Sequence, residues 1–252
     1  MGPPQHGEAV ILRSRLYGES DKIVTFLTAD AGKLTGIGKG AKNSKRRFAN
    51  CLEPFTRVRV HYRPPRPGTT LVFMDSCDLL RPVATLAEPA KLAYGSYLVE
   101  LVDLLTEEAH PVPEVYRLLD SALDVLEHGP ATAAFLRSFE LQLLCDAGYE
   151  PRLLQCGRCH RDISDDITAH FDPSHGSVIC DNCNNSNQPM PAVSIGSLQA
   201  LEELKHGALP SLSDMRLTRQ VANDAAQLMG YLLAQHLRRP LRSLEMIAAL
   251  TV

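Results

Sequence analysis

Two pairs of cysteines place the strongest constraint on how this chain folds. Each pair has the spacing Cys-x-x-Cys, and 20 residues separate the two pairs. Two thiolates at this spacing can bind one metal ion from a single turn, and two such turns complete a tetrahedral zinc site. Between the pairs, residues 167–171 and 177–179 predict two short strands joined by a turn at 172–176, as in zinc ribbons. We therefore expect one structural Zn²⁺ ion, with the ligands Cys156, Cys159, Cys180 and Cys183.

Other roles for these thiols remain open at this stage. The pairs could instead be redox-active or carry no metal, and His160, His170 or His175 could replace a cysteine as ligand. Four protein ligands would leave the ion no open coordination position, so it would stabilise a module rather than act in catalysis. The chain has seven cysteines, an odd number, and no secretion signal, which argues against a disulfide framework.

The charge of the chain is unevenly distributed. Residues 1–80 contain 13 Lys and Arg against 7 Asp and Glu, a balance of +6, whereas residues 81–252 contain 13 against 22, a balance of −9. A basic first third favours contact with a polyanion, although chance variation between solvated surfaces is the alternative. No apolar stretch approaches the roughly 20 residues of a membrane span. We therefore expect a cytoplasmic protein without a membrane segment.

The first 81 residues predict a small β-barrel. Short strands are expected at 9–16, 22–28, 33–38, 55–63 and 69–74, separated by glycine-rich or proline-rich turns. Five short strands in this length fit the OB-fold best. In the fourth strand, apolar residues alternate with Arg57, Arg59, His61 and Arg63, so this polar face is expected to meet solvent or an anion.

A cluster of cations in this barrel suggests a nucleic-acid interface. Cations along a flexible loop can follow a phosphate backbone. The candidate DNA-binding residues are Lys33, Lys39, Lys42, Lys45, Arg46, Arg47, Arg57, Arg59 and Arg63. Four aromatic residues are candidates for stacking on unpaired bases, with burial in the barrel core as the alternative: Phe48, Phe55, Tyr62 and Phe73. Residues 36–41 also satisfy a relaxed dinucleotide-binding fingerprint, but neither the apolar helix nor the acidic residue of that motif follows. No other catalytic motif is present, so we do not expect an enzyme.

From residue 88 onward the apolar residues recur with helical spacing. Helices are expected around 98–105, 113–126, 131–147, 194–206 and 217–237. The predicted fold is α+β and multidomain, with an OB-fold barrel at 1–81, a helical domain at 82–151 and 191–252, and an inserted zinc ribbon at 152–190.

Several segments of this chain resemble a known family. They are residues 9–15, 17–24, 28, 32–34, 38–42, 45–48 and 52–55, followed by the cysteine segment 156–183 and the ending at 239–243. Over nearly its whole length the chain is similar to the RecO family of bacterial recombination mediators, in its zinc-bearing branch.

The resemblance implies a function in DNA repair and recombination. Proteins of this family have an OB-fold, a helical domain and often a zinc module, and they are not enzymes. They bind single- and double-stranded DNA, anneal complementary strands and, with RecR, help load RecA onto DNA coated by single-strand-binding protein. In some members the helical part contacts the acidic tail of single-strand-binding protein; cations suited to such a tail are Arg137, Arg238, Arg239 and Arg242. The resemblance also implies a place in the bacterial cytoplasm, at the nucleoid. A zinc-ribbon transcription or RNA-binding factor and a nucleotide-dependent enzyme are the alternatives.

Overall fold

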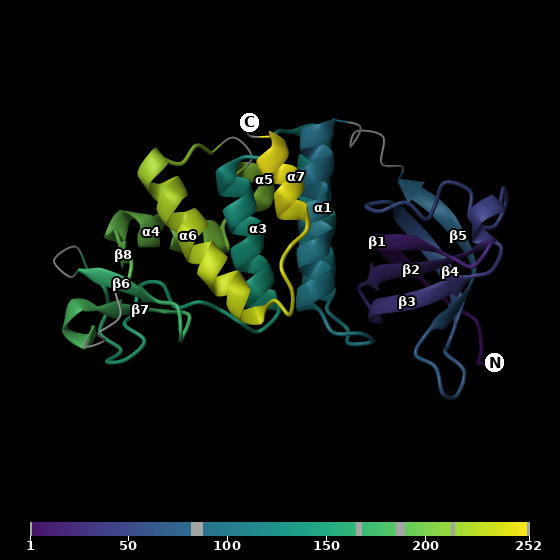
Figure 1. Ribbon diagram of the computed structural model, residues 1–252, viewed down its shortest axis with the longest axis horizontal. Helices are drawn as coiled ribbons and strands as arrows, with labels where there is room; N and C mark the ends of the chain where they lie inside the picture. Colours follow the sequence, from purple (N-terminus) through teal and green to yellow (C-terminus); the bar gives the residue numbers. More distant parts are fainter. Residues whose placement is uncertain (1, 82–87, 165–167, 185–189, 213–214, 251–252) are drawn as a thin grey trace. The chain divides into compact units, whose positions relative to one another are not determined.

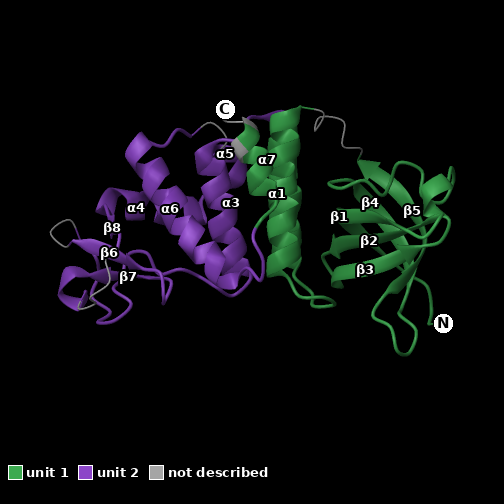
Figure 2. Ribbon diagram, in the orientation of Figure 1, with its two compact units in different colours: residues 1–127, 241–252 green, residues 128–240 purple. Residues whose placement is uncertain are grey.

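The computed structural model describes residues 2–81, 88–164, 168–184, 190–212 and 215–250. The chain divides into two compact units, with residues 1–127 and 241–252 in unit 1 and residues 128–240 in unit 2 (Figure 2). Ile167, the expected first residue of the ribbon hairpin, and residue 82, the expected start of the helical domain, lie outside the described residues. Within the described part, no helix is long and apolar enough to cross a membrane.

Unit 1 begins with a closed five-stranded barrel, as predicted (Figure 1). Its strands are β1 (Gln5–Tyr17), β2 (Asp21–Thr28), β3 (Gly32–Gly38), β4 (Arg57–Arg63) and β5 (Val72–Arg81). They pair in the order β1-β2-β3-β5-β4, and β4 closes the barrel on β1. Only the β3–β5 pair among these strands is parallel. This closed order is the OB-like arrangement that strand number and turn composition predicted.

The barrel core consists of one face of each strand and the inner side of one loop. The strand residues are Ala9, Ile11, Val24, Phe26, Leu34, Val58, Val60, Tyr62, Val72 and Met74, and the loop between β3 and β4 adds Ala41, Phe48, Cys51 and Leu52. Gly36 lies where β3 meets β5, and a Cβ atom there would come within 2.7 Å of Met74 Cγ and 2.9 Å of Val72 Cγ2. Only glycine therefore allows the two strands to approach closely enough to close the barrel.

Three α-helices complete unit 1 within its described residues. They are α1 (Pro89–Leu105), α2 (Pro113–His128, whose last residue lies just past the unit boundary) and α7 (Ser243–Leu250). Helix α7 packs on α1, and its start is held by the carboxylate of Glu100, which accepts hydrogen bonds from Ser243 N at 2.9 Å and Ser243 Oγ at 2.7 Å. This carboxylate satisfies N–H groups that have no partner within the first turn of a helix.

Unit 2 contains four helices and a small sheet in its described part. The helices are α3 (Ala133–Asp146), α4 (Ile195–His206), α5 (Leu209–Leu212) and α6 (Arg219–His236). The sheet pairs β7 (Ser177–Cys180) with β6 (Ala169–Asp172), and β6 with β8 (Ala192–Val193). Ser194 caps α4 by accepting a hydrogen bond from Ser197 N at 3.1 Å, as the sequence predicted. Helix α3 ends just before Gly148, whose φ of 84° suits glycine.

Candidate nucleic-acid interface and metal site

The loop between β3 and β4, residues 39–56, carries most of the predicted cations; we call it the basic loop. It contains a short 3₁₀ turn, η1 (Ala41–Asn43), and four of its residues, Ala41, Phe48, Cys51 and Leu52, are buried in the barrel core. Four backbone hydrogen bonds tie it to neighbouring elements: Lys42 N to Ser20 O at 3.0 Å, Cys77 N to Arg47 O at 2.8 Å, Phe55 N to Ile11 O at 2.8 Å and Ile11 N to Thr56 O at 3.0 Å. The loop therefore has a fixed inner side and a cationic outer side.

Three cations of the basic loop are available for a ligand. The side chains of Lys42, Lys45 and Arg46 are exposed, and none makes an ion pair or hydrogen bond to the described part of the chain. Lys42 and Lys45 line a shallow groove whose other polar lining residues are Lys22, Ser44, Asn50 and Glu53. The one carboxylate in this lining, Glu53, is paired with Lys22 Nζ at 3.1 Å. Glu53 therefore does not neutralise Lys42 or Lys45, and both can bind an external anion.

Lys39 and Arg47 are also exposed, but they have internal partners. Lys39 Nζ lies 2.5 Å from Asp21 Oδ2, while Gly40 N donates to Asp21 Oδ1 at 2.9 Å. These hydrogen bonds, led by that of Lys39, lower the pKa of Asp21. Arg47 Nη2 donates to the carbonyl oxygen of Lys39 at 2.6 Å, and its guanidinium carbon lies 5.2 Å from the centre of the Phe48 ring. Asp21 was not among the predicted site residues, although an acidic side chain beside a basic segment was a visible signal.

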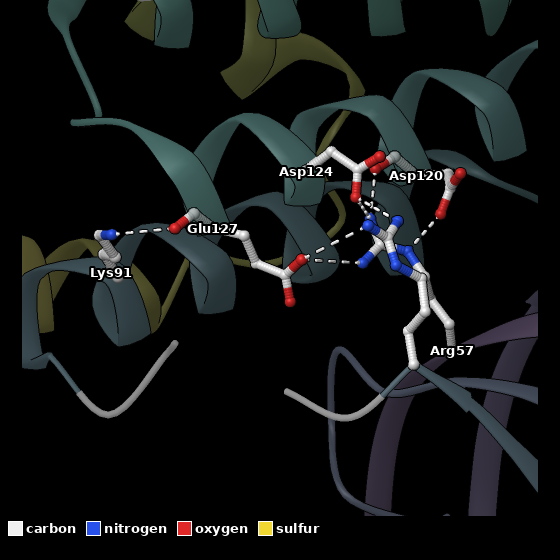
Figure 3. Close-up of polar contacts among 6 residues, drawn as sticks. Arg57, Lys91, Asp120, Asp124 and Glu127 are labelled. Atoms are coloured by element: carbon white, nitrogen blue, oxygen red, sulfur yellow. Dashed lines mark hydrogen bonds and ion pairs between the residues drawn. The ribbon is translucent and has the colours of Figure 1, made fainter. Parts of the chain in front are cut away.

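Arg57 was expected from the sequence to lie on an open surface, but it is buried. It is 6% exposed, and its guanidinium is surrounded by carboxylates of α2 (Figure 3). It contacts Asp120 Oδ1 through Nε, and its Nη2 donates to Asp124 Oδ1 at 2.7 Å and to Asp120 O at 2.6 Å. Glu127 Oε2 lies 3.8 Å from Nη1. Arg57 thus joins the barrel to α2 within unit 1 instead of presenting a free charge.

Lys33 is internal as well. It is 7% exposed, and its Nζ contacts the carbonyl oxygen of Asp103 and lies 3.4 Å from the Asp103 carboxylate. The partners of Lys33 and Arg57 belong to helices that come 60 or more residues later in the chain, which is why a local pattern of cations did not reveal them.

Arg59 and Arg63 point outward from β4, opposite to the buried Val58, Val60 and Tyr62. Each is paired on the surface, Arg59 with Glu8 at 2.9 Å and Arg63 with Asp75 at 2.8 Å. Exposed pairs of this kind are weak and exchange readily with an incoming phosphate. These two residues can therefore bind phosphate only if their ion pairs with Glu8 and Asp75 break.

Three of the four proposed stacking residues are buried. Phe48, Phe55 and Tyr62 are 3%, 7% and 5% exposed, and Phe73 is half-buried. For Phe48 and Tyr62 the core alternative is correct, because both belong to the apolar cluster that fills the barrel. An aromatic face in this position is already covered by protein atoms and is not available to a base.

The four predicted metal ligands lie together in unit 2. The Sγ atoms of Cys156, Cys159, Cys180 and Cys183 are all within 4.8 Å of one another. The Sγ atoms of Cys159 and Cys180 are 3.8 Å apart, far beyond a disulfide bond but equal to the edge of a tetrahedron, about 3.8 Å, for metal–sulfur bonds of about 2.3 Å. The cysteines therefore fit one tetrahedral metal ion.

The backbone around Cys156 favours the thiolate form of this residue. Burial alone would raise the pKa of the Cys156 thiol, but hydrogen bonds from the backbone N–H groups of Cys159, Cys180 and Arg158 outweigh it and lower the pKa to about 6. His170 and His175 are instead bound to carboxylates, at 3.1 Å from Asp181 and 3.0 Å from Asp172. No histidine belongs to the metal-ligand cluster found among the described residues.

Two family models cover almost the whole chain. The model "Recombination protein O N terminal" matches residues 3–83, which include the barrel and the basic loop, and "Recombination protein O C terminal" matches residues 86–245. The chain belongs to the RecO family. RecO relatives align with it over most of their length: one from Myxococcus xanthus (strain DK1622) is 37% identical over 242 residues, 96% of each chain. Others come from Anaeromyxobacter sp. (strain K), with 35% identity over 92% of this chain and 91% of the relative, and from Geobacter sulfurreducens, with 33% over 98% and 99%.

All three RecO relatives are named DNA repair proteins, which makes this chain a member of a DNA repair family. The four cations expected to meet an acidic protein tail are divided between the units. Arg137 on α3, Arg238 and Arg239 belong to unit 2, whereas Arg242 belongs to unit 1. Arg137 is paired with the buried carboxylate of Glu140 at 3.0 Å, and Arg238 and Arg242 are exposed.

Proposed function

We propose that this RecO family member binds single- and double-stranded DNA with its basic loop, and anneals complementary strands without hydrolysing a nucleotide. With RecR, it would help to load RecA onto DNA coated by single-strand-binding protein. Work on chromosomal DNA would place the protein in the cytoplasm, at the nucleoid. The cations we assign to the acidic tail of single-strand-binding protein are Arg137, Arg238, Arg239 and Arg242, of which Arg238 and Arg242 are exposed.

The observation that carries this proposal is the set of three exposed cations without an internal partner among the described residues: Lys42, Lys45 and Arg46. Lys39 and Arg47 stand beside them, which gives about five phosphate contacts within one loop. Such contacts release condensed counterions, so affinity falls steeply with salt. Lys33 and Arg57 are left out of the interface because their charges are already neutralised inside unit 1.

The number of contacts fixes the expected salt dependence. Five phosphate contacts predict a slope of log affinity against log salt of about −4.5 for duplex DNA and about −3.5 for single strands. Raising the salt fourfold should therefore weaken duplex binding by roughly 500-fold. Neutralising three of the contacts should make the duplex slope shallower by about 2.7.

The test replaces Lys42, Lys45 and Arg46 together by glutamine in the full chain. A matched control removes the same charge from exposed arginines outside the barrel, by Arg117→Gln, Arg152→Gln and Arg219→Gln. Affinity is measured by fluorescence anisotropy of labelled oligonucleotides from 50 to 200 mM salt, and annealing is followed without ATP. The loop variant should lose affinity, slope and annealing rate, and the control should keep them. Equal slopes in the two variants would refute the assignment of the basic loop.

For the metal, we propose Zn²⁺ held by Cys156, Cys159, Cys180 and Cys183. When bound, the ion cross-links two turns and closes the small sheet of β6, β7 and β8 into a stable module. The four thiolates leave it no open position, so its contribution is to folding. Metal content by mass spectrometry of the purified chain, at one Zn²⁺ per molecule, tests the assignment.

A further inference from the structure

The tip of the β1–β2 hairpin, residues 16–20, carries an exposed aromatic side chain. Tyr17 is 53% exposed, whereas every other Phe or Tyr in the described part of the barrel is buried or half-buried. Gly18, with a φ of 63°, forms the turn directly after it, and nothing lies within 4 Å of the position of a Cβ there. The Tyr17 ring therefore lies outside the barrel core, at an open turn where a ligand can reach it.

This hairpin tip is attached to the basic loop. Ser20 O accepts the hydrogen bond of Lys42 N, and the Asp21 carboxylate binds Lys39 Nζ and Gly40 N. Tyr17 and Asp21 are directly opposite each other in the β1–β2 pair, so their side chains share one face of the sheet. Tyr17 therefore stands on the same face as the side chain that positions Lys39.

A second cation lies on this face. Arg15 precedes Tyr17 by two residues in β1, so both side chains point to the same side of the strand, about 7 Å apart along it. Arg15 is exposed and has no ion-pair or hydrogen-bond partner in the ranges that the structure describes. Tyr17 thus has one cation, Arg15, two residues away on its own strand, and a second cation, Lys39, bound to the residue opposite it, Asp21.

We propose that Tyr17 stacks on an unpaired base while Arg15 and Lys39 bind the phosphates on either side of that nucleotide. The inference rests on the proposed binding of DNA by the basic loop, and it adds a reason for the protein to prefer single-stranded over duplex DNA. Alternating cations and aromatic faces are what binding of single strands requires, because each base has a π-face and each linkage a charge. In a duplex the base faces are covered by neighbouring base pairs, so the ring finds no partner and only the cations act.

The test compares Tyr17→Leu, which removes the ring but keeps an apolar side chain, with Tyr17→Phe, which keeps the ring. Tyr149→Leu, a change at another exposed tyrosine, is the matched control. The ligands are a 20-nucleotide thymidine strand, a strand of the same length with abasic sites, and a 20-base-pair duplex, all at one salt concentration. Tyr17→Leu should weaken binding of the thymidine strand by about 5- to 100-fold, as expected for the loss of one stacked base.

The other arms separate stacking from charge. Tyr17→Leu should bind the duplex and the abasic strand within twofold of the parent chain, and Tyr17→Phe and Tyr149→Leu should match the parent on all three ligands. A strand containing 5-iododeoxyuridine should cross-link to Tyr17 on irradiation, located by mass spectrometry of the digested complex. Unchanged thymidine-strand binding by Tyr17→Leu, or an equal loss on strand and duplex, would overturn the inference.

These outcomes also distinguish the inference from the function beneath it. If the Lys42, Lys45 and Arg46 variant loses affinity and salt slope but Tyr17→Leu behaves as the parent, stacking alone is wrong. If neither variant changes binding, the basic loop is not the interface and both proposals fail.

Discussion

Replacing Arg57 by alanine removes a buried positive charge from the centre of a group of carboxylates. In the folded chain this guanidinium contacts Asp120, Asp124 and Glu127 of α2, and its side chain is 8% exposed (Figure 3). The alanine variant leaves the three carboxylates close together without their central cation. We therefore expect a loss of stability in unit 1 and no direct effect on DNA.

The exposure of the partners sets the size of this loss. Breaking a fully buried ion pair costs about 3–5 kcal/mol because a charge is left without compensation. Here the side chains of Asp120 and Asp124 are 37% and 40% exposed and reach water, and only Glu127, at 15%, is well covered. Arg81 also remains, with Nη1 at 2.6 Å from Asp124. We expect the lower end of the range, about 3 kcal/mol.

The matched control is Arg59→Ala, on the same strand. The Arg59 side chain is 44% exposed, and its ion-pair partner among the described residues is Glu8, so its loss should cost less than about 1 kcal/mol. Urea unfolding followed by circular dichroism gives the stability, and hydrogen exchange of residues 57–63 and 113–127 shows where it is lost. If the two variants were equally stable, or if Arg57→Ala lost DNA affinity while keeping its stability, the assignment of Arg57 to a structural contact would be refuted.

Three further predictions concern other parts of the chain. Removing the metal with a chelator, or the change Cys159→Ser, should speed hydrogen exchange across residues 156–183 and leave exchange in the barrel unchanged. An equal increase in exchange in both regions would contradict a role of the metal in the folding of this segment alone. Glu100→Ala removes the acceptor for Ser243 N and Oγ and should lower the stability of α7 by about 1–2 kcal/mol, seen as faster exchange at 243–250; unchanged exchange there would contradict it. The pKa of Asp21 in the folded chain is lowered from 3.8 by its hydrogen bonds to the basic loop. The stabilisation that these bonds give is therefore fully present above pH 3.8 and is lost as the pH falls through the folded-state pKa. The Gly40 amide resonance should shift during this acid titration and should not shift near neutral pH.

The elements that local patterns define could be predicted from the sequence. The five barrel strands follow from short apolar segments between glycine-rich or proline-rich turns, with a clear alternation in the fourth, and Ser194 marks the start of α4 as a capping residue does. Strand β5 runs to Arg81, beyond the expected end at Met74, because Asp75, Ser76 and Asp78 interrupt its apolar pattern while β4 still pairs with it. Helix α7 was not predicted because its eight residues are too few to show the helical spacing of apolar residues. In addition, its start is stabilised by Glu100, which lies far away in the sequence.

The sites divide along the same line. Cys156, Cys159, Cys180 and Cys183 carry their geometry in their spacing, and the structure brings their thiols together as predicted. A cation, in contrast, looks the same in sequence whether it is free or paired, and the partners of Arg57 and Lys33 lie 63 and 70 residues farther along the chain. Only tertiary structure separates these two from Lys42, Lys45 and Arg46. Phe48 is a similar case, since burial of an aromatic residue depends on how the whole loop folds.

The contact between α7 and α1 has a consequence for synthesis on the ribosome. Glu100 and Ser243 are 143 residues apart, so at about 5–20 residues per second roughly 7–30 s pass between the two during translation. In that interval all of residues 128–240 are made, while the face of α1 that receives α7 stays uncovered. The synthesis of unit 2 is thus complete before that of unit 1, because unit 1 needs residues 241–252 at the end of this sequence. A messenger RNA truncated after codon 240 would yield a polypeptide with every residue of unit 2 and a unit 1 without α7, a species for chaperones or proteases to recognise by the apolar side of α1.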